Sequence, residues 1–561
     1  MLRRYFGLVL IILLTLGGNY AERARDGMWS LYQRYASPYL APLPSGTAAP
    51  ALAGKVLVIV VRDLGVERSR ALGALNALRG QGADFVLAQT PPTYALPALM
   101  TLLSGASAEI HGYTGNDATG HVSPDSWLRA AQDAGLNAVV IASSRWEGIA
   151  DGESVRFEPP LGTTPATADL DAVERAREAL GAAVTPARLV VVELQSLTVR
   201  EDGAAQERVN TAIRTLSEAA FARGGTASTA VLVISDRGTF PDGADGGGES
   251  DVAAIPLVMA GAGIRAGASG AARATAFAPT VSALVGLRMP QHAEDGLLAG
   301  ALTRPPLTAS ASQLATFYEG WSEVVHQPRF AAEQFRGAQA GLSSGSETAY
   351  RTLVISMQAS ATNAREARLN LERAQRLPVV AGGLLIIVVL GLLALSAGGW
   401  RAALGALLTL GGAALFFALG RGHSLSLSVL PAGQSATFFD ETTRDVAAVM
   451  GLSGVLIGAL SGGLEDVLHA ITAAISGLAL AVLAALCVPL WYYALYGPGI
   501  TWALPESGLF IGALTALTGV ASTDLRVLPG NAPIPLAFVI AAVAALAYFL
   551  TRPSRSRRWT R

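Results

Sequence analysis

Acidic side chains follow two apolar runs that are typical of buried strands. Asp63 comes after the run Lys55–Val61, and Asp236 comes after the run Ala230–Ile234. The carboxyl ends of parallel strands meet at one edge of a sheet, so we expect these two carboxylates to lie close together. Carboxylate oxygens are ligands for Mg²⁺ and Ca²⁺. An oxygen-only metal site could therefore form from a wider acidic set: Asp63, Asp236, Asp242, Asp245 and Glu249.

The same positions allow an arrangement without a metal. Asp63 and Asp236 would repel each other, and buried carboxylates that lack a partner are costly. Arg237 or Arg62 could supply the compensating charge, because a guanidinium binds carboxylates through two parallel hydrogen bonds. We therefore hypothesise an Asp63–Arg237–Asp236 cluster as the alternative to a metal site.

Alternating strands and helices must position these side chains. The strand candidates are short, continuous and rich in Val, Ile and Leu, as is typical of strands covered on both faces. Helical stretches separate them, which predicts an α/β fold with a doubly wound, mostly parallel sheet. The predicted strands are Lys55–Val61, Asp84–Ala88, Asn137–Ala142, Leu189–Leu194, Ala230–Ile234 and Ile255–Ala260. The predicted helices are Ser69–Arg79, Asp125–Ala134, Leu170–Leu180 and Ala205–Ala222.

Four stretches at the strand ends resemble the alkaline phosphatase superfamily, which includes nucleotide pyrophosphatase/phosphodiesterases, sulfatases, and phosphoethanolamine and phosphoglycerol transferases. They are Lys55–Asp63, Thr90–Gly112, Ser235–Ile264 and Ala278–Gly286. Their order and spacing match over residues 54–300. The resemblance implies a domain of that type, in which a Ser, Thr or modified Cys attacks phosphorus or sulfur beside one or two metal ions.

The residues to which the resemblance assigns chemistry are changed in this chain. The nucleophile position falls on Ala95, whose methyl group cannot attack, and Thr90 and Thr93 occupy other places on the turn. The histidine of the family's S-D-H-G motif is Arg237, and a later histidine position falls on Asp245.

Too few metal ligands therefore remain. Zinc and similar ions favour imidazole nitrogen, yet none of His111, His121 and His292 falls on a ligand position. The segment Gln195–Asp202, directly after the run Leu189–Leu194, contains no histidine, although the family has a further ligand element there. Asp63, Asp236 and Asp245 are the remaining metal candidates, and Zn, Mn, Mg or Ca is expected only if the chain is an active enzyme.

Long apolar runs predict a membrane protein. Apolar residues make up 51% of the chain and charged residues 15%. Tyr5–Gly18, after Arg3 and Arg4, is short for a membrane span and could be the core of a signal peptide or a signal anchor, of which we favour the anchor. The later runs are Val379–Ala397, Ala402–Leu419, Ala447–Gly463, Ala470–Tyr496, Ser507–Ser522 and Ile534–Thr551. The basic tail favours the cytoplasm, so we expect an odd number of crossings after the external domain, with Ala447–Gly463 or Ser507–Ser522 re-entrant.

The expected domains are a signal anchor or N-terminal transmembrane helix (1–20), a juxtamembrane segment (21–53), an alkaline-phosphatase-like extracytoplasmic domain (54–300), a helical stalk (301–376), a bundle of five or six transmembrane helices (377–551) and a basic tail (552–561). One cysteine, Cys487, excludes a disulfide framework. A net charge of −1 argues against nucleic acid as a partner.

Together these patterns favour a multi-pass protein of a bacterial plasma (inner) membrane. Its external domain is interpreted as a pseudoenzyme that binds, scaffolds or regulates, with the lipid bilayer, envelope lipids or other membrane proteins as partners. An active metal-dependent phosphodiesterase, sulfatase or head-group transferase is the alternative, and a transport or lipid-handling protein is the second alternative.

Overall fold

The computed structural model describes residues 2–117, 123–150, 152–181, 186–199, 203–431, 433–462, 466–524 and 536–551. The basic tail and His121 lie outside these ranges. The chain forms two compact units. The sheet unit comprises Gln33–Arg368 and Thr501–Leu504, and the helical unit comprises Met1–Tyr32, Leu369–Ile500 and Pro505–Arg561.

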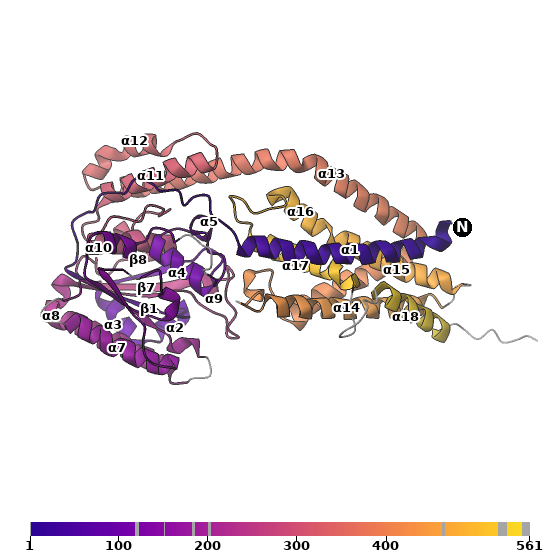
Figure 1. Ribbon diagram of the computed structural model, residues 1–561, viewed down its shortest axis with the longest axis horizontal. Coiled ribbons are helices and arrows are strands. Elements are labelled where there is room, and N and C mark those ends of the chain that lie inside the picture. The colour runs from indigo at the N-terminus through magenta and orange to yellow at the C-terminus, as the bar shows by residue number, and fades with distance from the viewer. Residues whose placement is uncertain are drawn as a thin grey trace, which may run out of the picture. The chain divides into compact units, whose positions relative to one another are not determined.

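The sheet unit is built on a mixed sheet of eight strands in the order β4-β3-β5-β1-β6-β7-β2-β8 (Figure 1). Strand β7 is antiparallel to both of its neighbours, β6 and β2. The other neighbouring strands pair in parallel. The strands are β1 Lys55–Val61, β2 Ala83–Ala88, β3 Ala138–Ile141, β4 Val155–Glu158, β5 Leu189–Leu194, β6 Thr229–Ser235, β7 Ala254–Gly261 and β8 Ser269–Arg273.

The six strands predicted from apolar runs are all present, within one residue at each end. Strands β4 and β8, which are the two edges of the sheet, were not predicted from the sequence. An edge strand has one hydrogen-bonded neighbour and is partly exposed, so the alternating Val-Arg-Phe-Glu of β4 and the small residues of β8 suffice there. The sheet is therefore parallel except at β7, which pairs antiparallel with both of its neighbours.

Helices cover both faces of this sheet (Figure 1). Helices α3 Gly73–Gln81, α7 Pro165–Gly181 and α8 Ala205–Ser228 contribute to one apolar core with the inner strands. Helices α4 Ala95–Ser104, α6 Trp127–Asp133 and α10 Phe277–Val285 pack together on the opposite face. The predicted helix Ser69–Arg79 is two helices, because α2 Val66–Arg70 ends before α3 begins. Short helices complete this part: α5 Ala108–His111 and α9 Ser250–Ala253.

Beyond the sheet, α11 Leu307–Val324 and α12 Ala331–Ser343 are separated around Pro328, whose ring and missing N–H do not fit the interior of a helix. The Gly/Ser-rich segment Gly337–Gly345 is mostly helical, because α12 extends to Ser343. Only Gly345 in it has a positive φ, of 77°, so the chain turns there and not earlier. Helix α13, Glu347–Leu415, begins directly afterwards.

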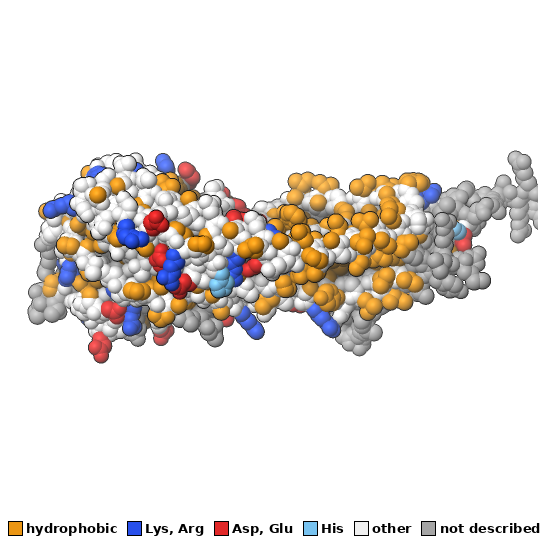
Figure 2. Space-filling view, turned by 90° about the horizontal axis from the view of Figure 1, so that it is seen from above, with side chains coloured by type: hydrophobic (Ala, Val, Ile, Leu, Met, Phe, Trp, Pro, Cys, Tyr) orange, Lys and Arg blue, Asp and Glu red, His pale blue; other side chains and the backbone are white. Residues whose placement is uncertain are grey.

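The helical unit contains three helices that are long and apolar enough to cross a membrane, among the described residues. They run over Glu347–Gly420, Ser435–Leu460 and Val467–Tyr496. Figure 2 shows hydrophobic side chains gathered over this unit. The remaining bounds are α1 Leu2–Gln33, η5 Phe416–Gly420, α14 Ser435–Leu460, α15 Val467–Ala485, α16 Cys487–Tyr496, α17 Ser507–Ala521 and α18 Leu536–Thr551.

Helix α13 reverses direction at Gly399, which has a left-handed φ of 59°. Before this residue, Gly383 faces Leu490 and Gly391 faces Leu480, so the segment runs antiparallel to α15 and α16. After it, Gly405 faces Ile457 and Gly412 faces Val449, so this segment runs antiparallel to α14. The two apolar runs on either side of Gly399 are therefore separate antiparallel segments.

Helices α17 and α18 lie along successive parts of α14. At the end of α17, the Ser522 hydroxyl donates to the Thr443 carbonyl at 3.2 Å. In α18, Ile540 contacts Gly454, and the Thr551 hydroxyl donates to the Ala459 carbonyl at 3.1 Å. At 1.5 Å per residue each of these helices is only about 22–24 Å long, shorter than a hydrocarbon core of about 30 Å. They follow one another along a single partner.

Candidate functional site: a buried arginine–carboxylate cluster

Arg237 lies among three carboxylates at the end of β6. Its Nη2 is 2.9 Å from Asp63 Oδ1, its Nη1 is 2.8 Å from Asp236 Oδ2, and its Nε is 2.7 Å from Asp245 Oδ2. All four side chains are at most 10% exposed. The structure thus brings together the residues that strand ends predict as neighbours, with a guanidinium at their centre.

Asp236 uses both of its carboxylate oxygens. Oδ1 accepts the backbone N–H of Asp63 at 3.1 Å and that of Arg237 at 2.9 Å. Oδ2 accepts Arg237 Nη1 at 2.8 Å and Arg145 Nη2 at 3.0 Å. Asp63 has a left-handed φ of 59°, a conformation in which Asp is an enriched residue type. The backbone of Asp63 is therefore tied to the Asp236 carboxylate.

Glu193 and Arg145 extend this cluster, and the sequence analysis missed both. Glu193 Oε1 accepts Arg145 Nε at 2.7 Å and Trp146 Nε1 at 3.0 Å, while Oε2 accepts the Ser143 N–H at 2.9 Å. The Ser143 hydroxyl also donates to Oε2. Glu193 is fully buried near the end of β5, and Arg145 follows β3. A single glutamate inside the apolar run Leu189–Leu194 is the signal that could have revealed them.

Burial and the arginines have opposite effects on the carboxyl groups. Burial alone would raise the pKa of Asp236, but the charges of Arg237 and Arg145 outweigh it and hold that pKa below its ordinary value. The pKa of Glu193 is lowered in the same way, against burial, by Arg145 and Arg62. At Asp245 burial outweighs the attraction of Arg237, so the pKa of this carboxyl is raised. Asp236 and Glu193 are thus stabilised as anions.

Ala95 begins α4 beside the cluster. Its carbonyl accepts Arg145 Nη1 at 3.3 Å, and its methyl side chain has no nucleophilic atom. The nearby Thr93 hydroxyl donates to the Gly247 carbonyl at 2.7 Å and accepts the Gly246 N–H at 3.1 Å. Thr93 is fully buried. Its hydroxyl joins two loops and is fully used in doing so.

The residues present do not fit a catalytic metal. A cation between Asp63, Asp236 and Asp245 would have to displace the guanidinium of Arg237, which already contacts all three. Within the described ranges, no group of three or more His, Cys, Asp or Glu side chains is arranged to hold a metal ion. Like-charged arginine and metal ions would also repel each other in a buried site.

The remaining candidates have local contacts. Asp242 Oδ1 accepts the Ala244 N–H at 3.0 Å within its own loop. His111 Nδ1 accepts the Tyr113 N–H at 3.1 Å, so Nε2 carries the proton and lies 3.2 Å from the Thr101 hydroxyl. Glu249 precedes α9, and its carbonyl accepts the N–H groups of Val252 and Ala253.

His292 and the segment after β5 also have structural contacts. His292 Nε2 is 3.0 Å from the Ala41 carbonyl. After β5, the Asp169 carboxylate accepts the N–H groups of Gln195 and Ser196 at 2.6 and 2.9 Å, and residues 200–202 lie outside the described ranges. These contacts hold loops in place.

No family model matches the sequence, and no curated protein matches it. Among solved structures, the chain is similar to a 2-O GAG sulfatase, with 13% identity, a TM-score of 0.36, and coverage of 44% of this chain and 73% of that one. It is similar to murine ectonucleotide pyrophosphatase/phosphodiesterase 5 in complex with AMP, with 14% identity, a TM-score of 0.36, and coverage of 42% and 95%.

A third similar structure is a protein in the alkaline phosphatase superfamily from Vibrio parahaemolyticus. It has 14% identity, a TM-score of 0.35, and coverage of 48% of this chain and 76% of that one.

Proposed function

We propose that this chain is a membrane-anchored pseudoenzyme with an alkaline-phosphatase-like domain that serves binding, scaffolding or regulation. The observation that carries the proposal is Arg237, whose guanidinium contacts Asp63, Asp236 and Asp245 at 2.7–2.9 Å. Ester hydrolysis in this superfamily would need an attacking oxygen and a cation that lowers its pKa. Ala95 cannot supply the first, and the cluster is already neutralised by arginine.

The Ser143 hydroxyl donates to the Glu193 carboxylate. A hydroxyl beside a carboxylate could act as a nucleophile if that carboxylate were a general base. A general base must accept this proton and hold it near neutral pH. The pKa of Glu193 lies below its ordinary value because Arg145 and Arg62 stabilise the anion against burial. Glu193 is therefore a weak base, and the Ser143–Glu193 contact supports the cluster.

The helical unit supports membrane anchoring with the sheet unit outside the cytoplasm. Large apolar side chains are exposed along α13, including Leu385, Ile386 and Leu392. Leu10 and Leu14 of α1 are buried in the apolar core of the helical unit, as expected for an anchor that is retained. Each part of α13 forms one crossing, and so does α14. Helices α15 and α16 together form another crossing, and α17 and α18 together form the last, so the number of crossings after the sheet unit is odd. The basic tail then lies in the cytoplasm, in accord with the positive-inside rule.

The test uses full-length protein purified in detergent. We expect sub-stoichiometric metal by elemental analysis, a melting temperature unchanged by a chelator, and no hydrolysis of bis(4-nitrophenyl) phosphate or 4-nitrophenyl sulfate. Stoichiometric metal together with chelator-sensitive hydrolysis would overturn the proposal in favour of an active enzyme. In that case the Ser143→Ala variant determines whether the serine hydroxyl is the nucleophile.

A further inference from the structure

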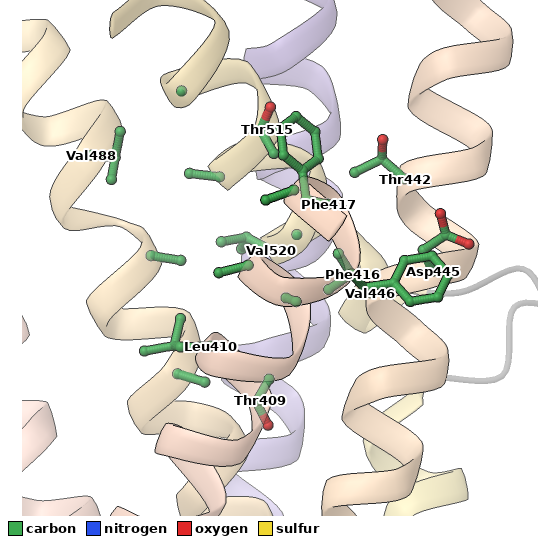
Figure 3. A pocket seen from close by; sticks show the side chains of 18 of the residues that line it. Thr409, Leu410, Phe416, Phe417, Thr442, Asp445, Val446, Val488, Thr515 and Val520 are labelled. Atoms are coloured by element: carbon green, nitrogen blue, oxygen red, sulfur yellow. The ribbon is translucent and has the colours of Figure 1, made fainter. Parts of the chain in front are cut away.

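The helical unit contains a pocket of about 480 Å³. Its walls come from the second part of α13, from η5, and from α14, α15, α16 and α17. Figure 3 shows the labelled side chains arranged around this space, among them Leu410, Phe417, Val446, Val488 and Val520. Closely packed helices would leave no such space between them.

The walls are apolar along most of their length and polar at one end. Ala414, Ala481 and Ala516 present small side chains that leave the space open. At the polar end Arg421 pairs with Asp445 at 2.9 Å and with Glu441 at 3.2 Å.

The pocket is an elongated slot. On α14 its lining extends from Glu441 to Met450, which at 1.5 Å per residue corresponds to about 13 Å. On α13 and η5 it extends from Thr409 to Arg421, about 18 Å by the same measure. The slot therefore matches the shape of an extended hydrocarbon chain better than that of a compact solute.

The π-helical turn η5 forms part of one wall. The Arg421 N–H donates to the Phe416 carbonyl at 3.0 Å, five residues back. Phe416 and Phe417, at the start of this turn, both line the pocket. π-Helical turns are rare and occur frequently at functional sites.

We propose that this slot binds one hydrocarbon chain of a bilayer phospholipid, with the polar head group at the Arg421–Asp445 end. The proposal rests on the membrane placement given above and adds a ligand to it. An apolar cavity does not hold water stably, and an empty one loses van der Waals contacts in proportion to its size. In a bilayer the available filler is a lipid chain. The head group of the phospholipid would lie near the charged side chains, where its polar atoms keep their hydrogen bonds.

The experiment compares two glycine-to-leucine variants of the full-length protein in nanodiscs that contain a phospholipid with a diazirine in its acyl chain. Gly512 lines the slot, and a Cβ there has only Val488 in ordinary contact at 3.7 Å, so Gly512→Leu fills the space. Gly451 on α14 does not line the slot and has open space around its Cβ position, so Gly451→Leu is the matched control. Cross-linked peptides are identified by mass spectrometry.

We expect cross-links on the inward peptides of α14 and α17 in the natural chain and in Gly451→Leu, with at least a five-fold loss in Gly512→Leu. Cross-links that are equal in all three proteins, or confined to the outer helix faces, would overturn the slot as a lipid site. Failure of the chain to enter nanodiscs would instead refute the membrane placement on which the proposal rests.

Discussion

Replacing Arg237 by methionine removes the cation that three buried carboxylates share. Asp63, Asp236 and Asp245 would then lie close together with much less compensation. Breaking a buried ion pair by removing one partner costs about 3–5 kcal/mol. We expect Arg237→Met to lower the free energy of unfolding of the sheet unit by about this amount at pH 7.

The loss should depend on pH. In the natural chain the pKa of Asp236 is depressed by Arg237 and Arg145 against burial, so its stabilising contribution is present above the unfolded value of 3.8 and is lost as pH falls through the lower folded value. Without Arg237 the folded pKa of Asp236 rises, and protonation relieves the repulsion. The difference in stability between the two proteins should therefore be largest near neutral pH and shrink as pH falls toward the acid range.

Hydrogen exchange followed by mass spectrometry measures this difference in full-length protein, because peptides from β1 and β6 report on the sheet unit alone. A loss of about 3–5 kcal/mol corresponds to a fall in protection of roughly 150- to 5,000-fold in these strands, at 1.36 kcal/mol per factor of ten. The control is Arg177→Met, which removes an exposed pair with Glu174 on α7 and should change stability by less than about 0.5 kcal/mol. Protection in Arg237→Met equal to that in the control would refute the shared-cation reasoning.

Three further substitutions test the same description. Arg237→His places an imidazole among the carboxylates, so micromolar zinc should raise the melting temperature of this variant but not that of the natural chain; equal responses would contradict the idea that arginine takes the place of a metal. Glu193→Gln removes the charge that Arg145 faces and should cost about 2–4 kcal/mol by exchange in β5, whereas the exposed Glu147→Gln should be nearly neutral; similar losses in both would count against a buried pair. Trp502→Ala should lower the free energy of unfolding of the sheet unit by about 3–5 kcal/mol, measured by hydrogen exchange in the segment that contains Tyr39. Trp491→Ala, at a side chain that is 59% exposed, should leave exchange in that segment unchanged.

The inner part of the sheet could be predicted because its strands are continuous apolar runs. Strand β4 could not, because its alternating residues are only partly buried and resemble a polar loop. In the helical unit, the break between Val379–Ala397 and Ala402–Leu419 was visible in the sequence, but the reversal at Gly399 depends on a backbone conformation that composition does not show.

The candidate site was predictable in part for the same reason. Asp63, Asp236 and Arg237 follow strands, and neighbouring strand ends share one edge. The Arg145–Glu193 pair joins residues 48 positions apart, across β3 and β5, and strand order cannot be read from local patterns. The charge of Glu193 within an apolar run predicts that a partner exists but does not identify it.

The four residues Thr501–Leu504 belong to the sheet unit although they stand far from it in the chain. The Trp502 carbonyl accepts the Tyr39 hydroxyl at 2.9 Å, the Leu504 N–H donates to Glu109 at 3.0 Å, and Arg368 lies 4.2 Å from the centre of the Trp502 ring. During synthesis these partners emerge from the ribosome long before Trp502 does. The sheet unit therefore reaches its final form only after most of the apolar segments have been translated, and a fragment that stops at Arg368 would lack the tryptophan that completes it.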